Sequence, residues 1–326
     1  RRLMIPIKLN TLPGLESLPD AVTVRGNPHP VPFSPPIDPD HVFSVDVVRP
    51  ILGWMLYDSP DMLLLFGDRG SGKSSTLRQF HAYLNLPMFS VSGHKRLEWE
   101  DLLGVKEIVD GDTITMDGPL TQAWRVGATF LFEEIDRAPE ETSIGLNPIL
   151  DGYPLINVLN GGEVIPRIAG ARCAATANTN GSGDVRGEYN TANILDQSLM
   201  DRMQAVRVDY PTPEQEFALL KKKLGDAIPD AMLNQSISMA NDIRFLHAGK
   251  TDRLSGHVQA SMAPTMETTL STRSLLRLWN LVILYAGVEK PLFYALDIAV
   301  TNKCSEVCAE AIKKIAEAHF AGGASP

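Results

Sequence analysis

The stretch DMLLLFGDRGSGKSSTLRQFHAYL, residues 61–84, decides the fold of this chain. Its apolar run, 61–66, predicts a short strand buried on both faces. The next eight residues, GDRGSGKS at 67–74, match G-x-x-x-x-G-K-[ST], a pattern in which backbone amides and a helix N-terminus surround phosphate oxygens. A helix over 73–84 completes the order strand, glycine-rich turn, helix. That order favours a phosphate-binding loop over the alternative, an accidental glycine-rich turn.

Four more apolar segments predict further strands of the same sheet, at 87–91, 128–133, 172–177 and 204–210. Helical stretches, including 45–56, separate the strands, so the pattern favours an α/β fold with a parallel sheet and right-handed crossovers. Two hairpins are predicted where a turn dipeptide lies between β-branched residues: Asp110-Gly111 within 107–115, and Asn160-Gly161 within 155–165.

The two ends of the chain differ from this central region. Residues 1–40 are rich in proline, which fixes φ and removes a backbone donor, so we expect an extended arm. The arm is either a disordered leader or a strap over a neighbouring surface. Beyond Pro211 the pattern is helical, at 214–224, 272–284 and 297–320. We therefore expect three parts: an arm at 1–40, an α/β nucleotide-binding domain at 41–211 and a helical lid domain at 212–326.

Composition narrows the classes of protein. The 326 residues are 44% hydrophobic and 21% charged, which excludes a disordered, collagen-like or coiled-coil chain. The net charge of −9 makes nucleic acid an unfavoured partner. Three cysteines form no disulfide framework, and no apolar run reaches the ~20 residues of a membrane helix. We expect a reduced, soluble, cytoplasmic protein.

The glycine-rich loop is the candidate binding site for ATP and Mg²⁺. Lys73 would reach the β- and γ-phosphates, and the Ser74 hydroxyl would ligate Mg²⁺. The residues expected to bind the nucleotide are Gly67, Asp68, Arg69, Gly70, Ser71, Gly72, Lys73, Ser74 and Ser75.

Two carboxylates end the apolar strand in FLFEEID, residues 130–136. Beside a phosphate loop, one acid faces Mg²⁺ and a second orients the attacking water, which assigns Glu133 to the metal and Glu134 to the general base. The metal position usually carries aspartate. The extra methylene of Glu133 moves its carboxylate outward, which predicts contact through water or weaker contact. The alternative is a pair of solvated acids. We expect Asp136 to help the next helix begin.

Three more residues extend the candidate site. Asn178 follows the strand 172–177 and would hold the attacking water beside the γ-phosphate; the alternative is a turn residue. Arg273 lies in the first turn of a predicted helix, where the dipole disfavours a cation, so either a phosphate lies nearby or the side chain is solvated. Arg202 precedes the last strand. It is either an arginine finger inserted into a neighbouring subunit's site, which requires a ring, or a cation favoured by a helix C-terminus.

Together these motifs resemble the AAA+ ATPases, and within them the MoxR group. LFEEIDRAPEE (131–141) is similar to the DEINRAP segment of that group, AATANT (174–179) to its ATxN element, LMDRM (199–203) to its LDRF element and STR (271–273) to its SPR element. The two hairpins match the insertions of that clade. Four segments resemble most the CobS-type ATPase subunits of aerobic cobaltochelatases: PPIDPDHVF (35–43), ATANTNGSGD (175–184), MDRMQAVRVDYP (200–211) and TNKCSEVCAEAIKKIAEAHF (301–320).

The resemblance covers roughly residues 35–320 and implies a P-loop αβα sandwich followed by a helical lid. It implies a hexameric ring with Mg-ATP between subunits, and a partner with a von Willebrand factor A domain through which force reaches a target. It also implies the site roles: Walker A for Lys73 and Ser74, Walker B for Glu133 and Glu134, sensor 1 for Asn178, arginine finger for Arg202 and sensor 2 for Arg273. Cobalt insertion into a corrin ring belongs to other subunits, and nothing in this sequence would hold a tetrapyrrole.

Three functions stay open on the sequence. The first is a ring ATPase that remodels a protein partner. The second is a nucleic-acid motor, which the acidic charge and the scarcity of Lys and Arg in the hairpins disfavour. The third is a nucleotide-gated scaffold with slow turnover, motivated by Glu133 in the metal position.

Overall fold

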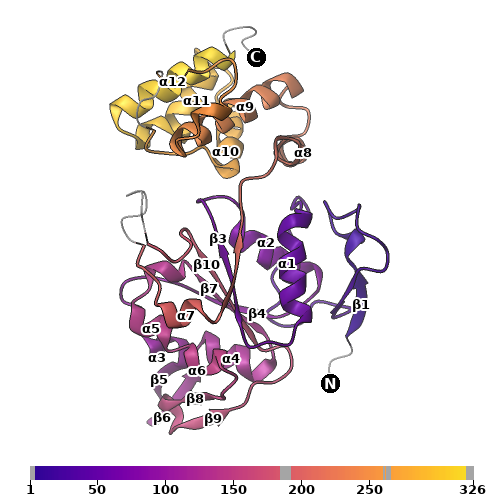
Figure 1. The fold of residues 1–326 in the computed structure, drawn as a ribbon, viewed down its shortest axis with the longest axis vertical. Helices are drawn as coiled ribbons and strands as arrows, with labels where there is room; N and C mark the ends of the chain where they lie inside the picture. Colours follow the sequence, from indigo (N-terminus) through magenta and orange to yellow (C-terminus); the bar gives the residue numbers. More distant parts are fainter. Residues whose placement is uncertain (1–3, 184–191, 260, 262–265, 321–326) are drawn as a thin grey trace. The chain divides into compact units, whose positions relative to one another are not determined.

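A computed structural model describes residues 4–183, 192–259, 261 and 266–320 (Figure 1). The chain divides into two compact units, Arg1–Asp209 and Tyr210–Pro326. Each unit has hydrophobic core clusters of its own, so each is described separately. Among the described residues we find no helix with the length and hydropathy that a membrane crossing requires.

A five-stranded parallel sheet forms the centre of the first unit, in the order β11-β3-β10-β7-β4. Its strands are β3 (Met62–Phe66), β4 (Met88–Ser92), β7 (Thr129–Glu133), β10 (Arg172–Ala177) and β11 (Met203–Arg207). The predicted α/β fold with a parallel sheet is confirmed. Since β10 lies between β3 and β7, the carboxyl ends of these three strands meet at one edge, which brings the glycine-rich loop, the paired acids and Asn178 together.

Both faces of the sheet are covered, which explains why its strands are continuously apolar. One core cluster joins one face to the helices of residues 45–56 and 73–83 and to the N-terminal segment, through Leu63, Leu65, Leu131 and Ala174. The other joins the opposite face to the helices of residues 99–103 and 119–126 and the segments around them, through Leu64, Phe130, Phe132, Cys173 and Ala175. The period of two along each strand therefore assigns neighbouring residues to different cores.

The helices of the first unit are α1 (Val45–Leu56), α2 (Lys73–Tyr83), α3 (Trp99–Leu103), α4 (Pro119–Val126), α5 (Glu140–Ile144), α6 (Asn147–Leu150) and α7 (Gln197–Met200). Local sequence sets several of their ends. Pro119 opens α4, where its missing N–H has no helical partner to lose, and Gly127 closes it at φ 67°. A capping box of Glu98 and Asp101 opens α3.

The N-terminal segment belongs to the first unit. Strands β1 (Ile5–Lys8) and β2 (Thr23–Gly26) form an antiparallel hairpin. The leucines between them, Leu9, Leu12 and Leu15, are at most 2% exposed and share a core cluster with Trp54 of α1. The expectation of an extended arm therefore does not describe residues 4–26, because regularly spaced leucines outweigh the prolines there.

The proline-rich stretch that follows crosses α2 and β4 of its own unit. The Phe33 carbonyl accepts a hydrogen bond from the Met88 amide at 3.0 Å, and the Phe33 ring lies 4.6 Å from that of Phe89. The Gln79 side chain on α2 accepts from the Asp38 amide and donates to the Pro36 carbonyl. Of the two alternatives for this stretch, these contacts fit the strap.

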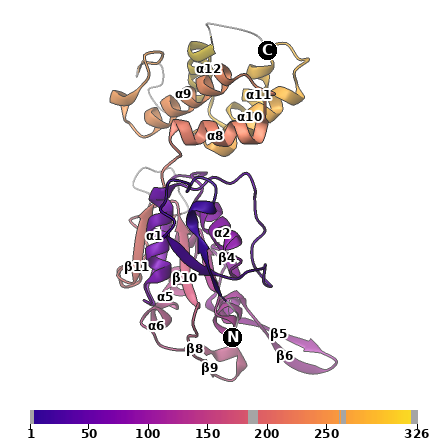
Figure 2. The same cartoon turned by 90° about the vertical axis from the view of Figure 1, so that its right-hand side faces the viewer.

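Both predicted hairpins are present. Strands β5 (Gly104–Val109) and β6 (Asp112–Asp117) pair antiparallel, and Asp110 and Gly111 make their turn with positive φ values of 53° and 91°. This hairpin extends away from the body of the first unit (Figure 2), and Ile108 on it is 79% exposed. Strands β8 (Leu155–Asn157) and β9 (Glu163–Ile165) form the second hairpin, whose connection is longer because residues 158–160 make a turn of 3-10 helix.

Among the described residues of the second unit, the regular elements are helical: α8 (Pro213–Leu224), α9 (Asp230–His247), α10 (Thr272–Leu284), α11 (Pro291–Ala299) and α12 (Glu306–Phe320). The prediction for 272–284 is confirmed, whereas the single helix predicted over 297–320 is wrong. The chain leaves helical geometry at Val300, with φ −135°, and makes a short 3-10 turn before α12. Helix α9 was not predicted.

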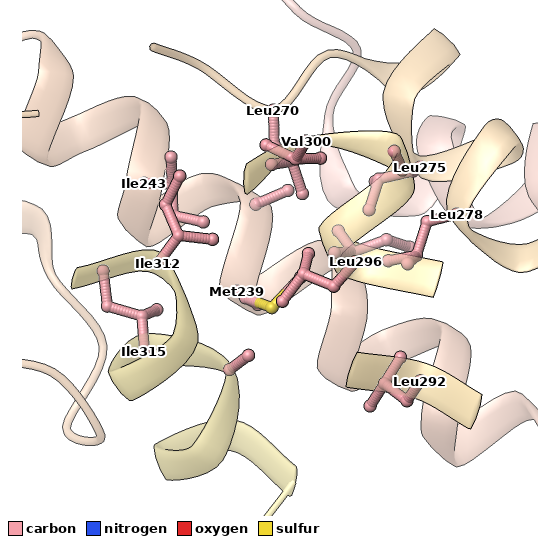
Figure 3. Close-up of a cluster of buried hydrophobic side chains, with 14 of the residues drawn as sticks. Met239, Ile243, Leu270, Leu275, Leu278, Leu292, Leu296, Val300, Ile312 and Ile315 are labelled. Atoms are coloured by element: carbon pink, nitrogen blue, oxygen red, sulfur yellow. The ribbon is translucent and has the colours of Figure 1, made fainter. Parts of the chain in front are cut away.

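The core of the second unit lies where these helices meet (Figure 3). Met239 and Ile243 of α9, Leu278 of α10, Leu296 of α11 and Ile312 of α12 are all at most 1% exposed. These side chains come from four helices, so this core forms only when the four helices pack together.

Candidate nucleotide-binding site

The glycine-rich loop lies between β3 and α2, as the sequence predicts. Gly70 and Gly72 have φ values of 76° and 95°, which L-residues rarely adopt. At Gly67 a side chain is excluded by space as well, because a Cβ atom there would lie 2.2 Å from the Val208 carbonyl oxygen. Since α2 begins at Lys73, the first backbone amides of the helix have no helical acceptor and face the loop. The loop therefore has the form of an anion-binding cradle.

Lys73 lies inside this cradle. Its ammonium donates to the carbonyls of Gly67 at 2.7 Å and Asp68 at 2.8 Å, and to the Asn178 side-chain oxygen at 3.3 Å. Burial lowers the pKa of Lys73 to about 8, partly opposed by the charges of Asp68, Asp136 and Glu134. A buried cation held by neutral oxygens attracts an anion strongly, so phosphate oxygens fit here.

The hydroxyls of the loop offer a second indication of a ligand. Within the described part of the chain, the buried Ser71 Oγ has no hydrogen-bond partner. A buried hydroxyl without a partner is costly, and a phosphate oxygen would satisfy it. Ser74, the second residue of α2, is half-buried, whereas Arg69 and Ser75 are exposed. The donor set therefore fits a nucleotide phosphate group.

Glu133 at the end of β7 forms an ion pair that the sequence did not predict. Its Oε2 lies 2.7 Å from an Nη atom of Arg78 on α2. Arg78 also donates to Ser90 Oγ on β4 at 2.9 Å. Glu133 and Ser74 are both oxygen donors, the type that Mg²⁺ prefers, so the residues fit a magnesium ion.

Glu134 lies in a strained backbone position. Its φ and ψ, 51° and 47°, are left-handed, and its amide donates to Thr176 Oγ at 3.2 Å. Gly93 lies so close that a Cβ atom there would be 2.2 Å from the Glu134 carbonyl oxygen. The Glu134 carboxylate pairs with Arg137. Strain of this kind persists where the surroundings fix it and is frequent at catalytic sites.

Asp136 does not start a helix, which corrects the sequence-based expectation. It lies in the 3-10 turn Ile135–Arg137, and α5 begins later, after Pro139, without a side-chain cap. Its fully buried carboxylate accepts the amides of Asn178 at 2.9 Å and Thr179 at 3.3 Å. Burial raises the pKa of Asp136, and the two amide bonds oppose that shift. Asp136 thus joins the acidic turn to the turn that holds Asn178.

Arg202 lies between α7 and β11 and is held within its own unit. Its Nε and one Nη atom contact the two oxygens of Asp151 at 2.7 and 2.8 Å, and the other Nη donates to the Ser198 carbonyl. Asp151 directly follows α6, shortly before the β8–β9 hairpin. The described contacts of Arg202 therefore do not include the glycine-rich loop.

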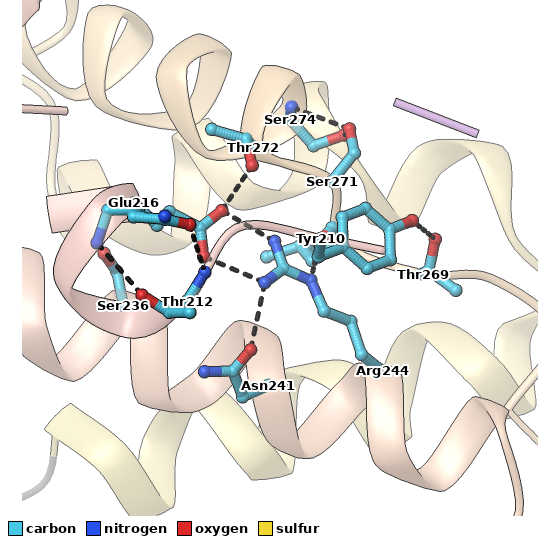
Figure 4. Close-up of polar contacts among 12 residues, drawn as sticks. Tyr210, Thr212, Glu216, Ser236, Asn241, Arg244, Thr269, Ser271, Thr272 and Ser274 are labelled. Atoms are coloured by element: carbon cyan, nitrogen blue, oxygen red, sulfur yellow. Dashed lines mark hydrogen bonds and ion pairs between the residues drawn. The ribbon is translucent and has the colours of Figure 1, made fainter. Parts of the chain in front are cut away.

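Arg273 belongs to the second unit and lies in the first turn of α10, as predicted. It is exposed there, which fits the solvated alternative. A buried polar network fixes that end of the helix (Figure 4). Glu216 accepts two hydrogen bonds from Arg244, each 2.8 Å, and one from Thr272 at 2.6 Å. Arg244 also donates to the Leu270 carbonyl, and its guanidinium lies 4.2 Å from the centre of the Tyr210 ring.

Sequence reasoning missed several of these contacts. Arg78, Arg137 and Asp151 each pair with a predicted site residue. Helical spacing offered one signal, because Arg78 lies four residues after Ser74 on the same face. Asp151 is remote in sequence from Arg202, so its role becomes visible only in the fold.

Comparison with known proteins identifies the family. Residues 62–203 match the profile of the AAA domain (dynein-related subfamily). The chain is 29% identical over 163 residues to protein NorQ of Paracoccus denitrificans, covering 50% of this chain and 58% of that protein. It is 25% identical over 280 residues to the aerobic cobaltochelatase subunit CobS of a Sinorhizobium species, covering 84% and 79%. It is 30% identical over 184 residues to the denitrification regulatory protein NirQ of Pseudomonas aeruginosa, covering 56% and 67%.

The region matched by the family profile contains the candidate nucleotide-binding site. The profile spans the sheet from the first residue of β3 to the first residue of β11, and it includes the glycine-rich loop and the paired acids. The match to CobS extends over most of the chain, whereas the chain spans little more than half of NorQ. The chain therefore belongs to the MoxR-type AAA+ ATPases, a family of ATP hydrolases.

Proposed function

We propose that this chain binds Mg-ATP at the glycine-rich loop and hydrolyses it at the boundary between subunits of a ring, to remodel a partner protein. The contact between Lys73 and Asn178 carries the proposal. It joins the cation of the loop to the amide beyond β10 at the position where a γ-phosphate would lie.

The binding step follows from the cradle. The phosphates take the place of the loop carbonyls as partners of Lys73, and they satisfy the buried Ser71 hydroxyl. Ser74 and Glu133 are the residues to hold Mg²⁺, which when bound supplies positive charge to the phosphate oxygens. Anion binding also favours the charged form of Lys73, whose pKa burial lowers to about 8.

The hydrolytic step belongs to Glu134 and Asn178. Glu134 accepts the proton of the attacking water, and the Asn178 amide orients that water. Asp136 keeps the two groups in register, because it accepts the Asn178 amide from the same turn that carries Glu134. To act as a base, Glu134 exchanges its ion pair with Arg137 for the water.

Assembly into a ring supplies further positive charge to the phosphates. We infer that Arg202 acts in trans as an arginine finger in a hexamer and leaves Asp151 when it meets the γ-phosphate of the next subunit. Arg273 contributes a second cation to the phosphates. Its place in the first turn of α10, where the helix dipole disfavours a cation, supports this role.

The partner is a protein, and we propose one that carries a von Willebrand factor A domain. The exposed side chains of the β5–β6 hairpin support a protein partner over a nucleic acid. Val105, Ile108, Ile114 and Met116 are 41–79% exposed. The charged residues of this hairpin are Lys106 with Glu107, Asp110, Asp112 and Asp117, which is the wrong balance for a phosphate backbone.

The first experiment tests the base. Glu134→Gln should keep ATP binding and ring assembly and lose turnover, since the amide cannot accept the proton. Undiminished hydrolysis in this variant would remove Glu134 from the mechanism. Wild-type turnover near background with normal ATP binding would favour the nucleotide-gated scaffold, and hydrolysis stimulated by DNA would favour the nucleic-acid motor.

A second experiment tests action in trans. Arg202→Ala should assemble but hydrolyse at least about 10³-fold more slowly. Mixing it with Lys73→Ala subunits should restore activity, because mixed boundaries join an intact cradle to an intact arginine. Arg125→Ala is the matched control, since Arg125 also forms paired contacts with acids on the first unit. Absence of rescue in mixed rings would contradict the role in trans.

A further inference from the structure

The two acids that follow each other at the end of β7 are held by different arginines. Glu134 pairs with Arg137 of its own turn, whereas Glu133 pairs with Arg78 from α2. Arg78 therefore contacts the acid assigned to the metal, and it does so from the helix that also carries Ser74. The position of Glu133 is thus coupled to the phosphate loop through α2.

The local structure explains how the pair forms. Arg78 is four residues after Ser74, so both side chains lie on one face of α2. Strand β4 is the neighbour of β7, and Ser90 on it accepts a second hydrogen bond from the same Nη atom of Arg78. The Arg78 side chain is 37% and that of Glu133 20% exposed, so solvent screens the pair only in part.

The chemistry of the pair opposes metal binding. The Arg78 guanidinium is a delocalised cation of the kind that pairs with carboxylates. Arg78 donates its hydrogen bond to Oε2 of Glu133. A divalent cation must therefore share the carboxylate with Arg78 and withstand the repulsion of its positive charge.

We propose that Arg78 is a positioning residue that holds Glu133 through Oε2 and lowers the affinity of the nucleotide site for divalent metal. The inference deepens the proposed function and rests on it. The longer side chain of glutamate is part of the arrangement, because its reach allows the carboxylate to contact Arg78. Metal affinity then depends on a residue of α2 as well as on the metal ligands themselves.

The test measures metal binding directly. Mn²⁺ is titrated into the full chain with saturating ADP and followed by electron paramagnetic resonance, and Mg²⁺ competition gives the affinity for magnesium. Arg78→Gln should bind either metal about tenfold more tightly than the wild type, because a cation beside the site is removed. Arg125→Gln, which removes the same charge from another ion-paired arginine, should leave metal affinity unchanged.

A second background makes the readout specific. In Glu133→Gln the same Arg78→Gln change should tighten metal binding by less than it does in the wild-type background, because the amide is no longer an anion for Arg78 to hold and only the repulsion of its charge remains. Unchanged or weaker metal binding in Arg78→Gln alone overturns the proposal, as does a lowered melting temperature as its only effect. Failure of wild-type protein to bind ADP would instead contradict the proposed function, so the two failures are distinguishable.

Discussion

The carboxylate of Asp136 accepts the backbone amide of Asn178 at 2.9 Å, and so joins the turn of the paired acids to the turn beyond β10. Both turns follow neighbouring strands of the sheet, yet backbone pairing between β7 and β10 ends before either turn. The buried carboxylate therefore continues the connection where the strands stop. Asp136, which has no assigned catalytic role, therefore fixes the position of the Asn178 backbone.

Replacing Asp136 tests this connection. Asp136→Ala should lower the free energy of unfolding by about 2 kcal/mol, because the partly buried amides of Asn178 and Thr179 lose their acceptor. It should also slow hydrolysis more than it weakens ATP binding. Asp136→Asn keeps an acceptor oxygen and should recover most of both properties. Unfolding by urea and initial rates of phosphate release are the measurements, and an Asp136→Ala variant with wild-type turnover would contradict the connection.

The first glycine of the phosphate loop gives a second prediction. Gly67→Ala should destabilise the first unit by about 2 kcal/mol and abolish ATP binding. Gly67 has a φ of 147°, and the new methyl group would lie 2.2 Å from the Val208 carbonyl oxygen. Gly53→Ala is its control. That position lies in α1 with no atom within 4 Å of an added Cβ, so it should gain about 1 kcal/mol. Equal behaviour of the two variants would show that the close approach is absent.

Buried His81 predicts how acid affects stability. Burial lowers the pKa of His81 to about 4, and its ring nitrogens contact the Leu77 carbonyl and Thr129 Oγ. The unfolded state, with the ordinary pKa of 6.5, binds more protons than the folded state between pH 6.5 and 4. The neutral imidazole therefore contributes stability above pH 6.5, and this contribution is lost as the pH falls from 6.5 to about 4. The total loss of unfolding free energy from His81 is about 3 kcal/mol.

The measurement is the free energy of unfolding of wild type and His81→Gln between pH 7 and 4. The variant should be less stable at pH 7 but lose less stability on acidification, since it has no imidazole to protonate. Parallel pH curves for the two proteins would rule out His81 as the titrating group.

The polar network of the second unit gives a prediction about stability. Glu216→Ala should destabilise this unit by about 3 kcal/mol, because it leaves the buried Arg244 charge unpaired. The double variant Glu216→Met with Arg244→Met should recover much of that loss, since both charges of this pair are removed. Hydrogen exchange in α8, α9 and α10 is the measurement. Wild-type protection in Glu216→Ala would mean that the ion pair stabilises little.

Much of the fold was predictable because the sheet is covered on both faces. Strands such as Met62–Phe66 are then continuously apolar and stand out in the sequence. Helix α9 was missed because its buried face includes Ser236, Asp242 and Arg244, which obscure the helical period. The N-terminal hairpin was missed because proline content suggested an extended chain.

The candidate site was predictable where spacing along the chain defines it, as in the loop around Lys73. The partners of its charged residues were not, because Arg78, Asp136 and Asp151 meet their partners through the sheet order and the packing of helices. Glu133 illustrates what the sequence alone leaves out. Its identity indicated altered metal contact, but only the fold identifies Arg78 as the group that competes for it.

The leucines between β1 and β2 set the first residue that a shortened gene must encode for the first unit to keep its core. The family profile starts at residue 62, yet Leu9, Leu12 and Leu15 fill the same core as Trp54 and Leu65. An expression plasmid that encodes only residues 62–203, which match the profile, would leave the apolar core around Trp54 and Leu65 exposed to water. Each missing leucine side chain represents about 2–5 kcal/mol of stability. The smallest autonomous ATPase fragment therefore includes the hairpin that precedes every recognisable motif.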